Sequence, residues 1–440
     1  MGTLLVGNPY NEHLVGDLDG FTPASRRAVG NSGLRMAWLA GPGDAVVAAQ
    51  DVDPGFLRYL LGLKGLPADS VSLLIPPPGR FGTDVLTRDR LLHPEFVEQA
   101  RRVVAENGID RVLPFSFDPV VVALARELGL SDATPGFAFL AAAGHDLLNS
   151  KSAFRAIAAG LGLPLAEGVV ADARQEAEAF AAGLLAEGRA VIVKQDFHAG
   201  GYGNEILAPA PGVEQVGASR LTVLRGRAEA ARHFERHWHR YAEGGGKVVL
   251  EHYLPDSVPL GSEVEVAAEA VTGRHACEMR MAPVFDGIVI PGTATTEEVR
   301  RTFMDAVLAL CEPVRAMGYR GLINVDGIAT PDGRVLLTEF NGRLGGTTHL
   351  HWFGTNLVGA DYLGSRLLVT RNRWRVPSLA AAIGALEAAG LAFDPGRRRG
   401  VVIACDHSRQ AGAVEYCAIA EDRRDAEEME KTLADLFSTG

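Results

Sequence analysis

The chain has 440 residues, of which 47% are hydrophobic and 22% charged, so it can fold into two or three domains and is not mostly disordered. Its 43 lysines and arginines stand against 54 acidic residues, and this net charge of −11 argues against nucleic acid as the main partner. Four scattered cysteines predict reduced, mostly buried thiols rather than a disulfide framework or a zinc site. No apolar stretch approaches the roughly 20 residues of a membrane span and no signal sequence is visible, so we expect a cytoplasmic protein with no membrane partner.

The first third of the chain alternates short apolar segments with segments of helical periodicity. The segments typical of strands are Thr3–Val6, Arg35–Leu39, Val71–Ile75 and Arg111–Phe115, and helical spacing covers Pro94–Glu106 and Pro119–Leu128. Alternating strands and helices predict a doubly wound parallel sheet. We place the end of this α/β domain at about residue 148.

The middle of the chain combines helices with two strands and a glycine-rich loop. Helices are expected at Lys151–Leu161, Arg174–Glu187 and Arg227–Tyr241, strands at Arg189–Gln195 and Lys247–Leu254, and the loop at His198–Asn204. This change of pattern marks a second domain that begins at about residue 149.

From residue 262 onward the pattern is mostly antiparallel. Strands are expected at Glu263–Ala270, Ala276–Phe285, Gly321–Ala329 and Val335–Phe340, and in the tail at Val401–Cys405 and Ala413–Ile419. A long helix is expected at Thr296–Met317, opened by a capping box of Thr295 and Glu298. The chain then ends in a helix with Met429 and Leu433 on one face.

The segment from Gly321 to Arg343 carries the most chemical information. Two apolar strands flank a Pro-Asp-Gly turn, which predicts a β-hairpin. Glu339, Asn341 and Arg343 share one face of the second strand, because side chains alternate along a strand. A tight turn would place Asp326 opposite Glu339, whereas a one-residue bulge would turn Asp326 away. Clustered carboxylate and amide oxygens suit Mg²⁺, and the alternative is a solvated polar face.

Two lysines and a glutamate supply further signals. Lys194 ends an apolar strand before the glycine-rich loop, where a lysine reaches phosphate oxygens or else extends into solvent. Lys151 opens a helix, another position where phosphate is favoured. Glu251 lies on a buried strand, and it either accepts a hydrogen bond from an adenine amino group, with Leu254 beside the ring, or is an edge-strand charge.

In this order and spacing, the motifs resemble the ATP-grasp superfamily over about residues 151–355. The superfamily pattern is a lysine, a second lysine before a glycine-rich lid, a glutamate on a hinge strand and an Asp…Glu-x-Asn-x-Arg segment. The matching positions are Lys151, Lys194, Glu251, Asp326, Glu339, Asn341 and Arg343. Twelve residues separate Asp326 from Glu339, which is common in ligases of this superfamily. Within it, the Asn-Ser-Lys and Thr-Glu-Phe-Asn-Gly-Arg segments and the extra C-terminal domain resemble the peptide ligase of the pheganomycin pathway.

The resemblance implies a fold, a reaction and partners. It implies an ATP-grasp domain at residues 149–377 with a lid at about 190–255, an N-terminal α/β pre-ATP-grasp domain at 1–148 and a small C-terminal α+β domain at 378–440. The implied enzyme uses ATP and Mg²⁺ to activate a carboxylate, in that relative a nonproteinogenic phenylglycine-like acid, as an acyl phosphate. It joins this small-molecule acid to the amine of a peptide or amino acid, releasing ADP and phosphate. A homodimer is compatible with the superfamily.

The resemblance also assigns roles to individual residues. The implied Mg²⁺ ligands are Asp326, Glu339 and Asn341. Both lysines and Arg343 would neutralise the transferred phosphoryl group. Arg280 is a further candidate to hold the carboxylate or acyl phosphate, or else a surface arginine. The ribose-binding carboxylate is either Asp256 or Glu263, of which we favour Glu263.

Two other functions and several weaker signals stand beside this interpretation. The alternatives are a ligase that forms dipeptides from L-amino acids and a nucleotide-binding scaffold without catalysis. Because inert binders need not keep every charge, the complete motif set argues against a scaffold. His233 has a second histidine one turn on, but Phe234 stands where a zinc-protease helix has Glu, so we expect a polar helix face. Residues His349–Trp352 either line an acceptor pocket or pack, and Cys405 beside His407 is expected to be structural.

Overall fold

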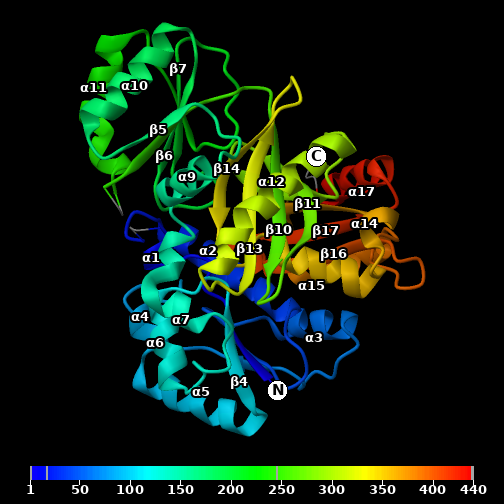
Figure 1. Cartoon of the computed structure of the whole chain (residues 1–440). Coiled ribbons are helices and arrows are strands. Elements are labelled where there is room, and N and C mark those ends of the chain that lie inside the picture. Colours follow the sequence, from blue (N-terminus) through cyan, green and yellow to red (C-terminus); the bar gives the residue numbers. More distant parts are fainter. Residues whose placement is uncertain (1, 16–17, 244–245, 438–440) are drawn as a thin grey trace.

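The computed structural model describes residues 2–15, 18–243 and 246–437, and the strands of this part of the chain form three sheets. In Figure 1 a four-stranded sheet lies at the bottom, a five-stranded sheet at the top, and an eight-stranded sheet between them. The first and second thirds of the chain thus flank a central sheet built from the rest of the chain, beginning at Val258.

The N-terminal sheet is parallel throughout, with strand order β3-β2-β1-β4, as the alternation of strands and helices predicts. Its elements are β1 (Gly2–Val6), α1 (Glu12–Val15), α2 (Pro23–Asn31), η1 (Ser32–Trp38), β2 (Ala45–Val47), α3 (Pro54–Leu63), β3 (Ser72–Leu74), α4 (Arg88–Leu91), α5 (Pro94–Asn107), β4 (Ile109–Pro114), α6 (Pro119–Glu127), α7 (Phe137–Phe139), η2 (Leu140–Gly144) and α8 (His145–Leu147).

The prediction of a strand at residues 35–39 is wrong. Most of this segment lies in η1, a 3-10 helix, and the second strand of the sheet is β2, further along the chain. Trp38 explains the apolar run, because its side chain is fully buried and its Nε1 donates to the carbonyl of Ala404 at 2.7 Å. A short apolar run indicates burial without deciding between helix and strand.

The five-stranded sheet has the order β5-β9-β6-β7-β8, and α10 and α11 pack against it (Figure 1). Its elements are α9 (Lys151–Gly160), β5 (Gly168–Ala171), α10 (Arg174–Ala186), β6 (Val191–Gln195), β7 (Asn204–Ala208), β8 (Arg220–Val223), α11 (Arg227–Tyr241) and β9 (Val248–His252). Strand β9 lies between β5 and β6, so Glu251 is not on an edge strand.

The central sheet is antiparallel, with strand order β14-β13-β10-β11-β12-β15-β17-β16. Its elements are β10 (Val258–Val266), β11 (Val271–Met281), β12 (Phe285–Ile290), α12 (Glu297–Ala316), β13 (Gly321–Ala329), β14 (Val335–Asn341), α13 (Thr348–Phe353), η3 (Gly354–Val358), α14 (Tyr362–Ser365), β15 (Leu367–Arg375), α15 (Leu379–Ala388), β16 (Gly400–His407), α16 (Ser408–Ala411), β17 (Ala413–Ala420) and α17 (Arg423–Leu436). The C-terminal strands β16 and β17 continue this sheet through β15, so the tail is part of the central sheet.

Boundaries in this region differ from prediction, and the strand expected at Ala276–Phe285 is divided between the end of β11 and the start of β12. Strand β10 begins at Val258 rather than Glu263, and α12 is capped by Thr296 rather than Thr295. Thr296 has the extended backbone of an N-cap, and its side chain accepts the N–H of Val299 at 3.3 Å. Phe303, Val307, Leu310 and Val314 form the buried face of this helix.

The four cysteines are all unpaired and buried, as predicted. Among the described residues, no helix is long and apolar enough to cross a membrane.

Candidate active site

A bulge in β14 brings Asp326 opposite Glu339. Near the turn Gly327 pairs with Leu337, a register that would put Asp326 opposite Thr338. The register shifts by one residue between Gly327 and Asp326, so Asp326 pairs with Glu339 instead. The predicted pairing is confirmed, but its predicted cause is wrong, because the turn is wider than two residues and the bulge compensates for it.

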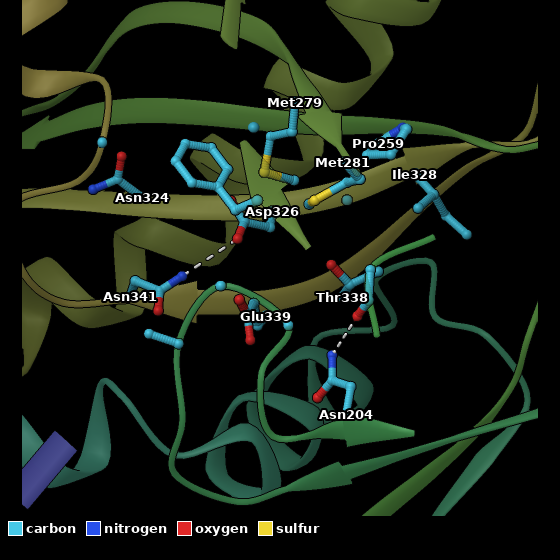
Figure 2. A pocket seen from close by; sticks show the side chains of 18 of the residues that line it. Asn204, Pro259, Met279, Met281, Asn324, Asp326, Ile328, Thr338, Glu339 and Asn341 are labelled. Carbon is cyan, nitrogen blue, oxygen red and sulfur yellow. Dashed lines mark hydrogen bonds between the residues drawn. The ribbon is translucent and has the colours of Figure 1, made fainter. Parts of the chain in front are cut away.

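The hairpin gathers two carboxylates, an amide and a guanidinium at one place. Figure 2 shows Asp326, Glu339 and Asn341 converging, and Asn341 Nδ2 donates to Asp326 Oδ2 at 3.5 Å. The amide oxygen of Asn341 accepts from Arg343 Nη2 at 2.7 Å, so it points toward the arginine and not toward the carboxylates. Burial and the neighbouring Glu339 raise the pKa of Asp326 well above its ordinary value. Two adjacent, half-buried carboxylates are a place where a cation would replace the shared proton.

Lys151 connects the hairpin to the glycine-rich loop. It is the first residue of α9, and Ser150 caps the helix by accepting the N–H of Ala153. The buried Lys151 ammonium lies 3.2 Å from Glu339 Oε2 and donates to the carbonyl of His198 at 2.9 Å. Burial alone would raise the pKa of Glu339, but Lys151 and Lys194 lower it to about 2. Lys151 therefore lies beside Glu339 of the hairpin.

Lys194 and Glu251 form a buried ion pair that the sequence did not predict. The Lys194 ammonium lies 2.6 Å from Glu251 Oε2, and Arg155 Nη1 donates to Glu251 Oε1 at 2.7 Å. A cation is bonded to each oxygen, so the carboxylate positions Lys194. Glu251 also lines the cavity, and its hydrogen bond to an adenine amino group stays a prediction. Leu254 lines the cavity beside this pair.

The preferred ribose-binding carboxylate is corrected by the structure. Glu263 is fully buried, does not line the cavity, and accepts from Thr347, Thr348 and Arg274. Asp256 is exposed and lines the cavity, so the alternative candidate is the one with access to a ligand.

Arg280 is also wrongly predicted. Met279 and Met281 line the cavity, and the residue between them on β11 points to the opposite face because strand side chains alternate. Arg280 Nη1 there donates to Glu430 Oε1 on α17 at 2.7 Å. It is a structural arginine outside the site.

One cavity of about 280 Å³ lies between the sheets, and the predicted site residues that line it are Lys194, Glu251, Leu254, Asp256, Asp326, Glu339, Asn341 and Arg343. Figure 2 shows Met279, Met281, Pro259 and Ile328 on one side of Asp326, with Glu339 and Asn341 on the other. The N-terminal domain completes the wall with residues that the sequence analysis did not single out: Pro9, Tyr10, Ser32, Arg35 and Phe115. No motif marks them, because they approach the hairpin only through tertiary packing.

Arg35 is held by the C-terminal segment. Its Nε donates to Glu415 Oε2 at 2.7 Å and its Nη2 to Glu415 Oε1 at 2.6 Å. His407 Nε2 lies 2.9 Å from the same Glu415 Oε1. Burial lowers the pKa of His407, but Cys405 and Glu415 outweigh this effect and raise it to about 10. Among the described residues, Cys405, His407 and Glu415 are the one group with metal-like spacing, and the arginine on the carboxylate argues for an ion-pair network instead.

We expect the contribution of His407 to the unfolding free energy to be lost as the pH rises from neutral to alkaline. Its pKa is higher in the folded protein than its ordinary value of 6.5, so its contribution is complete below about pH 6.5 and is lost as the pH rises toward 10. The unfolding free energy of the wild type, measured with urea at several pH values, should therefore fall over this range by more than that of His407→Gln. Parallel curves for the two proteins would contradict the expectation.

The weaker histidine signals have structural explanations. His233 Nε2 lies 2.8 Å from the hydroxyl of Tyr241 and 3.4 Å from Glu205, and its ring lies 4.7 Å from that of His237. Within the described residues these side chains do not form a group of three with metal-like spacing. His349 is buried against Phe353. His351 lines a second cavity, of about 740 Å³, and not the one at the hairpin.

Comparisons with known proteins agree with this architecture. The model of the pre ATP-grasp domain matches residues 33–130, and the model of the PGM1 C-terminal domain matches residues 381–433. A comparison with curated protein sequences gave no match.

Solved structures resemble the whole chain. Biotin carboxylase from Campylobacter jejuni, solved as a β-γ-ATP complex, has a TM-score of 0.60 at 12% identity, over 98% of this chain and 90% of its own. The N5-carboxyaminoimidazole ribonucleotide synthetase from Thermus thermophilus has a TM-score of 0.58 at 13% identity, over 100% and 99% of the two chains. The biotin carboxylase domain dimer of Hydrogenobacter thermophilus 2-oxoglutarate carboxylase, solved with MgADP, ADP and bicarbonate, has a TM-score of 0.57 at 12% identity, over 95% and 86%.

The chain therefore has the ATP-grasp fold. A pre-ATP-grasp domain precedes it and a C-terminal domain follows it, and the predicted fold class is confirmed.

Proposed function

We propose that this protein is an ATP-dependent ligase that activates a carboxylate as an acyl phosphate and joins it to an amine. The observation that carries the proposal is the convergence, in one cavity, of the hairpin carboxylates Asp326 and Glu339 with Arg343 and the buried Lys194. A second buried lysine, Lys151, lies 3.2 Å from Glu339 Oε2. Proteins of the same fold are solved with ADP, MgADP or an ATP analogue, which supports a nucleotide in this cavity.

The hairpin fits a divalent cation. Asp326 and Glu339 are paired across the hairpin and half-buried, and each places carboxylate oxygens beside the other. Carboxylate oxygens are the donors that Mg²⁺ selects. Asn341 would join them after its amide rotates away from Arg343. A bound Mg²⁺ would neutralise charge on the transferred phosphoryl group.

The cationic side chains serve the phosphates and the reacting carbonyl. Lys194, held by Glu251, and Lys151, held by Glu339, are placed to bind phosphate oxygens. The carboxylate oxygen attacks the γ-phosphorus and ADP leaves; the amine then attacks the acyl carbon and phosphate leaves. Arg343 is placed to stabilise the negative oxygen of the tetrahedral intermediate between these last two events.

The glycine-rich loop protects the acyl phosphate from water. The His198 ring stacks on Phe21 of the N-terminal domain at 6.5 Å, and its carbonyl accepts from Lys151. Gly201 has φ +82°, and a Cβ there would lie 2.8 Å from the carbonyl oxygen of Gly217, so this turn requires glycine. The loop is thereby folded over the cavity, where exclusion of water favours ligation over hydrolysis.

For the substrates, we propose a small amino acid of the phenylglycine type as the donor and the amino group of a peptide as the acceptor. The sequence resemblance to the pheganomycin-type peptide ligase supports this choice, and the apolar wall of Met279 and Met281 suits a donor or acceptor with a large apolar group. A dipeptide-forming ligase that takes free amino acids is the alternative.

The test is product analysis by mass spectrometry together with nucleotide analysis. The protein, Mg-ATP, a panel of phenylglycine-like and ordinary amino acids, and short peptides are mixed, with Glu339→Ala as the control. A product with the mass of acid plus amine minus water, formed with ADP and absent in the control, is expected. AMP in place of ADP would indicate an adenylate mechanism and contradict the proposal.

Asp256 provides a separate test of where the nucleotide sits. If its exposed carboxylate contacts the ribose, Asp256→Ala should raise the KM for ATP by about tenfold, the value of one lost charge-assisted hydrogen bond, and leave kcat nearly unchanged. Glu263→Gln should leave the KM for ATP unchanged, because Glu263 does not reach the cavity. If Glu263→Gln raised the KM for ATP and Asp256→Ala did not, Glu263 would be the carboxylate that contacts the ribose.

A further inference from the structure

We propose that Arg35 binds a carboxylate of the acceptor substrate, and that Glu415 and His407 of the C-terminal segment position it. This inference rests on the proposed function, since it names the group by which the second substrate is recognised. It also assigns a role to a segment distant from the hairpin in sequence.

Arg35 lies in a part of the cavity wall distinct from the metal hairpin. It belongs to η1 of the N-terminal domain, and Tyr10 and Ser32 line the cavity from the same domain. Apolar side chains from the central sheet, among them Met279 and Ile288, line the same cavity. A cation with an apolar surface nearby is suited to an amino acid or peptide that presents both a carboxylate and a hydrophobic side chain.

Hydrogen bonds to Glu415 fix the guanidinium of Arg35 but do not use all of its nitrogens. Nε and Nη2 both donate to Glu415, which leaves Nη1 with no hydrogen-bond partner within the described residues. The side chain is 13% exposed and lines the cavity, so Nη1 is accessible from it. Because the guanidinium is planar, holding one edge on Glu415 also fixes the direction of the free nitrogen.

The single negative charge of Glu415 cannot balance the two cationic groups that contact it. It is almost fully buried and receives two cationic groups, Arg35 and His407. Its Oε1 is shared between them at 2.6 and 2.9 Å. A substrate anion at Nη1 would balance the second cation, since buried charges are stable only when paired.

Arg90 shows how a purely structural arginine differs in the same chain. It is fully buried, and its three guanidinium nitrogens donate to four backbone carbonyls. Arg90 has no free nitrogen facing a cavity, whereas Arg35 has one. The difference points to a ligand for Arg35.

Arg343 is the second arginine of the cavity, and in the proposed function it acts on the carboxylate that is activated. It is bonded to Asn341 on the hairpin, so it belongs to the carboxylate that is activated. Tyr10 is within the electrostatic influence of both arginines, each of which lowers its pKa against the larger effect of burial. The cavity is therefore lined by two arginines, Arg343 after the hairpin and Arg35 on the N-terminal domain, each held by a different partner.

The test compares carboxylate with amide ligands in the presence of Mg-ADP. Binding of leucine, leucyl-leucine and phenylalanyl-leucine, each as the free acid and as the C-terminal amide, is measured by calorimetry on the full-length wild type and on Arg35→Gln. We expect at least one acid to bind the wild type about tenfold or more tightly than its amide, and Arg35→Gln to lose this difference. Arg35→Lys, which keeps the charge without the fork, should retain part of it.

Glu415→Gln tests the positioning role, with Glu430→Gln as its matched control. Both variants remove a glutamate that pairs with an arginine, but Glu430 pairs with Arg280 outside the cavity. The preference for acid over amide should shrink in Glu415→Gln and persist in Glu430→Gln, with the affinity for Mg-ADP unchanged in both.

Three results would overturn the inference. They are the absence of a carboxylate preference across the panel, a preference that survives Arg35→Gln, and a loss of Mg-ADP affinity in Arg35→Gln, which would place this arginine at the nucleotide. The product analysis described above is independent of these measurements. A protein that forms amide product without depending on Arg35 refutes this inference alone, and one that forms none refutes the proposed function.

Discussion

Glu339→Gln is expected to lower kcat for ligation by about 10³-fold or more, because under the proposed function it removes one of the two carboxylates that would hold Mg²⁺. The side chain keeps its size and one oxygen, so the cavity shape is retained. The loss should appear mainly in kcat, since the charge is needed most when the phosphoryl group moves. The measurement is initial-rate ADP release coupled to mass analysis of the amide product.

The control for this variant is Glu205→Gln. Glu205 is a buried glutamate on β7 of the five-stranded sheet. It pairs with Arg240 of α11 and does not line the cavity. Its substitution can lower stability but should leave the ligation rate within a few-fold of wild type at a temperature where both variants are folded. A Glu339→Gln protein with more than a tenth of wild-type kcat would refute the assignment of the hairpin as the metal site.

Glu251→Ala is expected to lower the free energy of unfolding by about 3–5 kcal/mol, the usual cost of leaving buried charges without their partner. Two cations depend on this carboxylate: Lys194, 7% exposed, and Arg155, 13% exposed. Chemical denaturation with urea, analysed at constant m-value, gives the difference directly. Lys194 would also lose its fixed position, so the KM for ATP should rise in the same variant.

The matched control is Glu167→Ala, which breaks an exposed ion pair with Arg189 on the same side of the molecule. Glu167 Oε2 lies 2.5 Å from Arg189 Nη2, but its side chain is 56% exposed. Solvent-exposed pairs contribute about 1 kcal/mol or less, so this variant should stay close to wild type. Equal effects of the two substitutions would mean that Glu251 does not act as a buried counter-ion.

Local patterns in the sequence predicted the elements and the chemistry of the hairpin. Periodicity of 2 on β14 placed Glu339 and Asn341 on one face, although the strand ends before Arg343. Helical spacing located α5, α6, α11 and α12 to within a residue or two. These are properties of neighbouring residues, and they need no knowledge of the rest of the chain. The order of motifs along the chain then indicated the fold, which the structural comparisons confirm.

Side-chain direction in longer-range contacts could not be predicted in the same way. Alternation along β11 says that Arg280 and Met279 face opposite sides, but only the packing of α17 decides that Arg280 faces outward. Likewise, Glu263 and Asp256 were both plausible from their order in the chain, and burial alone separates them.

The sequence by itself determined which residues carry charge and which strand face they share, because alternation and periodicity are set within a few residues. Only the tertiary structure decided the partners: Lys194 with Glu251 across paired strands, and Arg35 of the N-terminal domain with Glu415, 380 positions along the chain. Such pairs form when the folded chain excludes water from both groups. Whether a charge is free to bind a ligand or already committed to another residue therefore depends on contacts that no local pattern encodes.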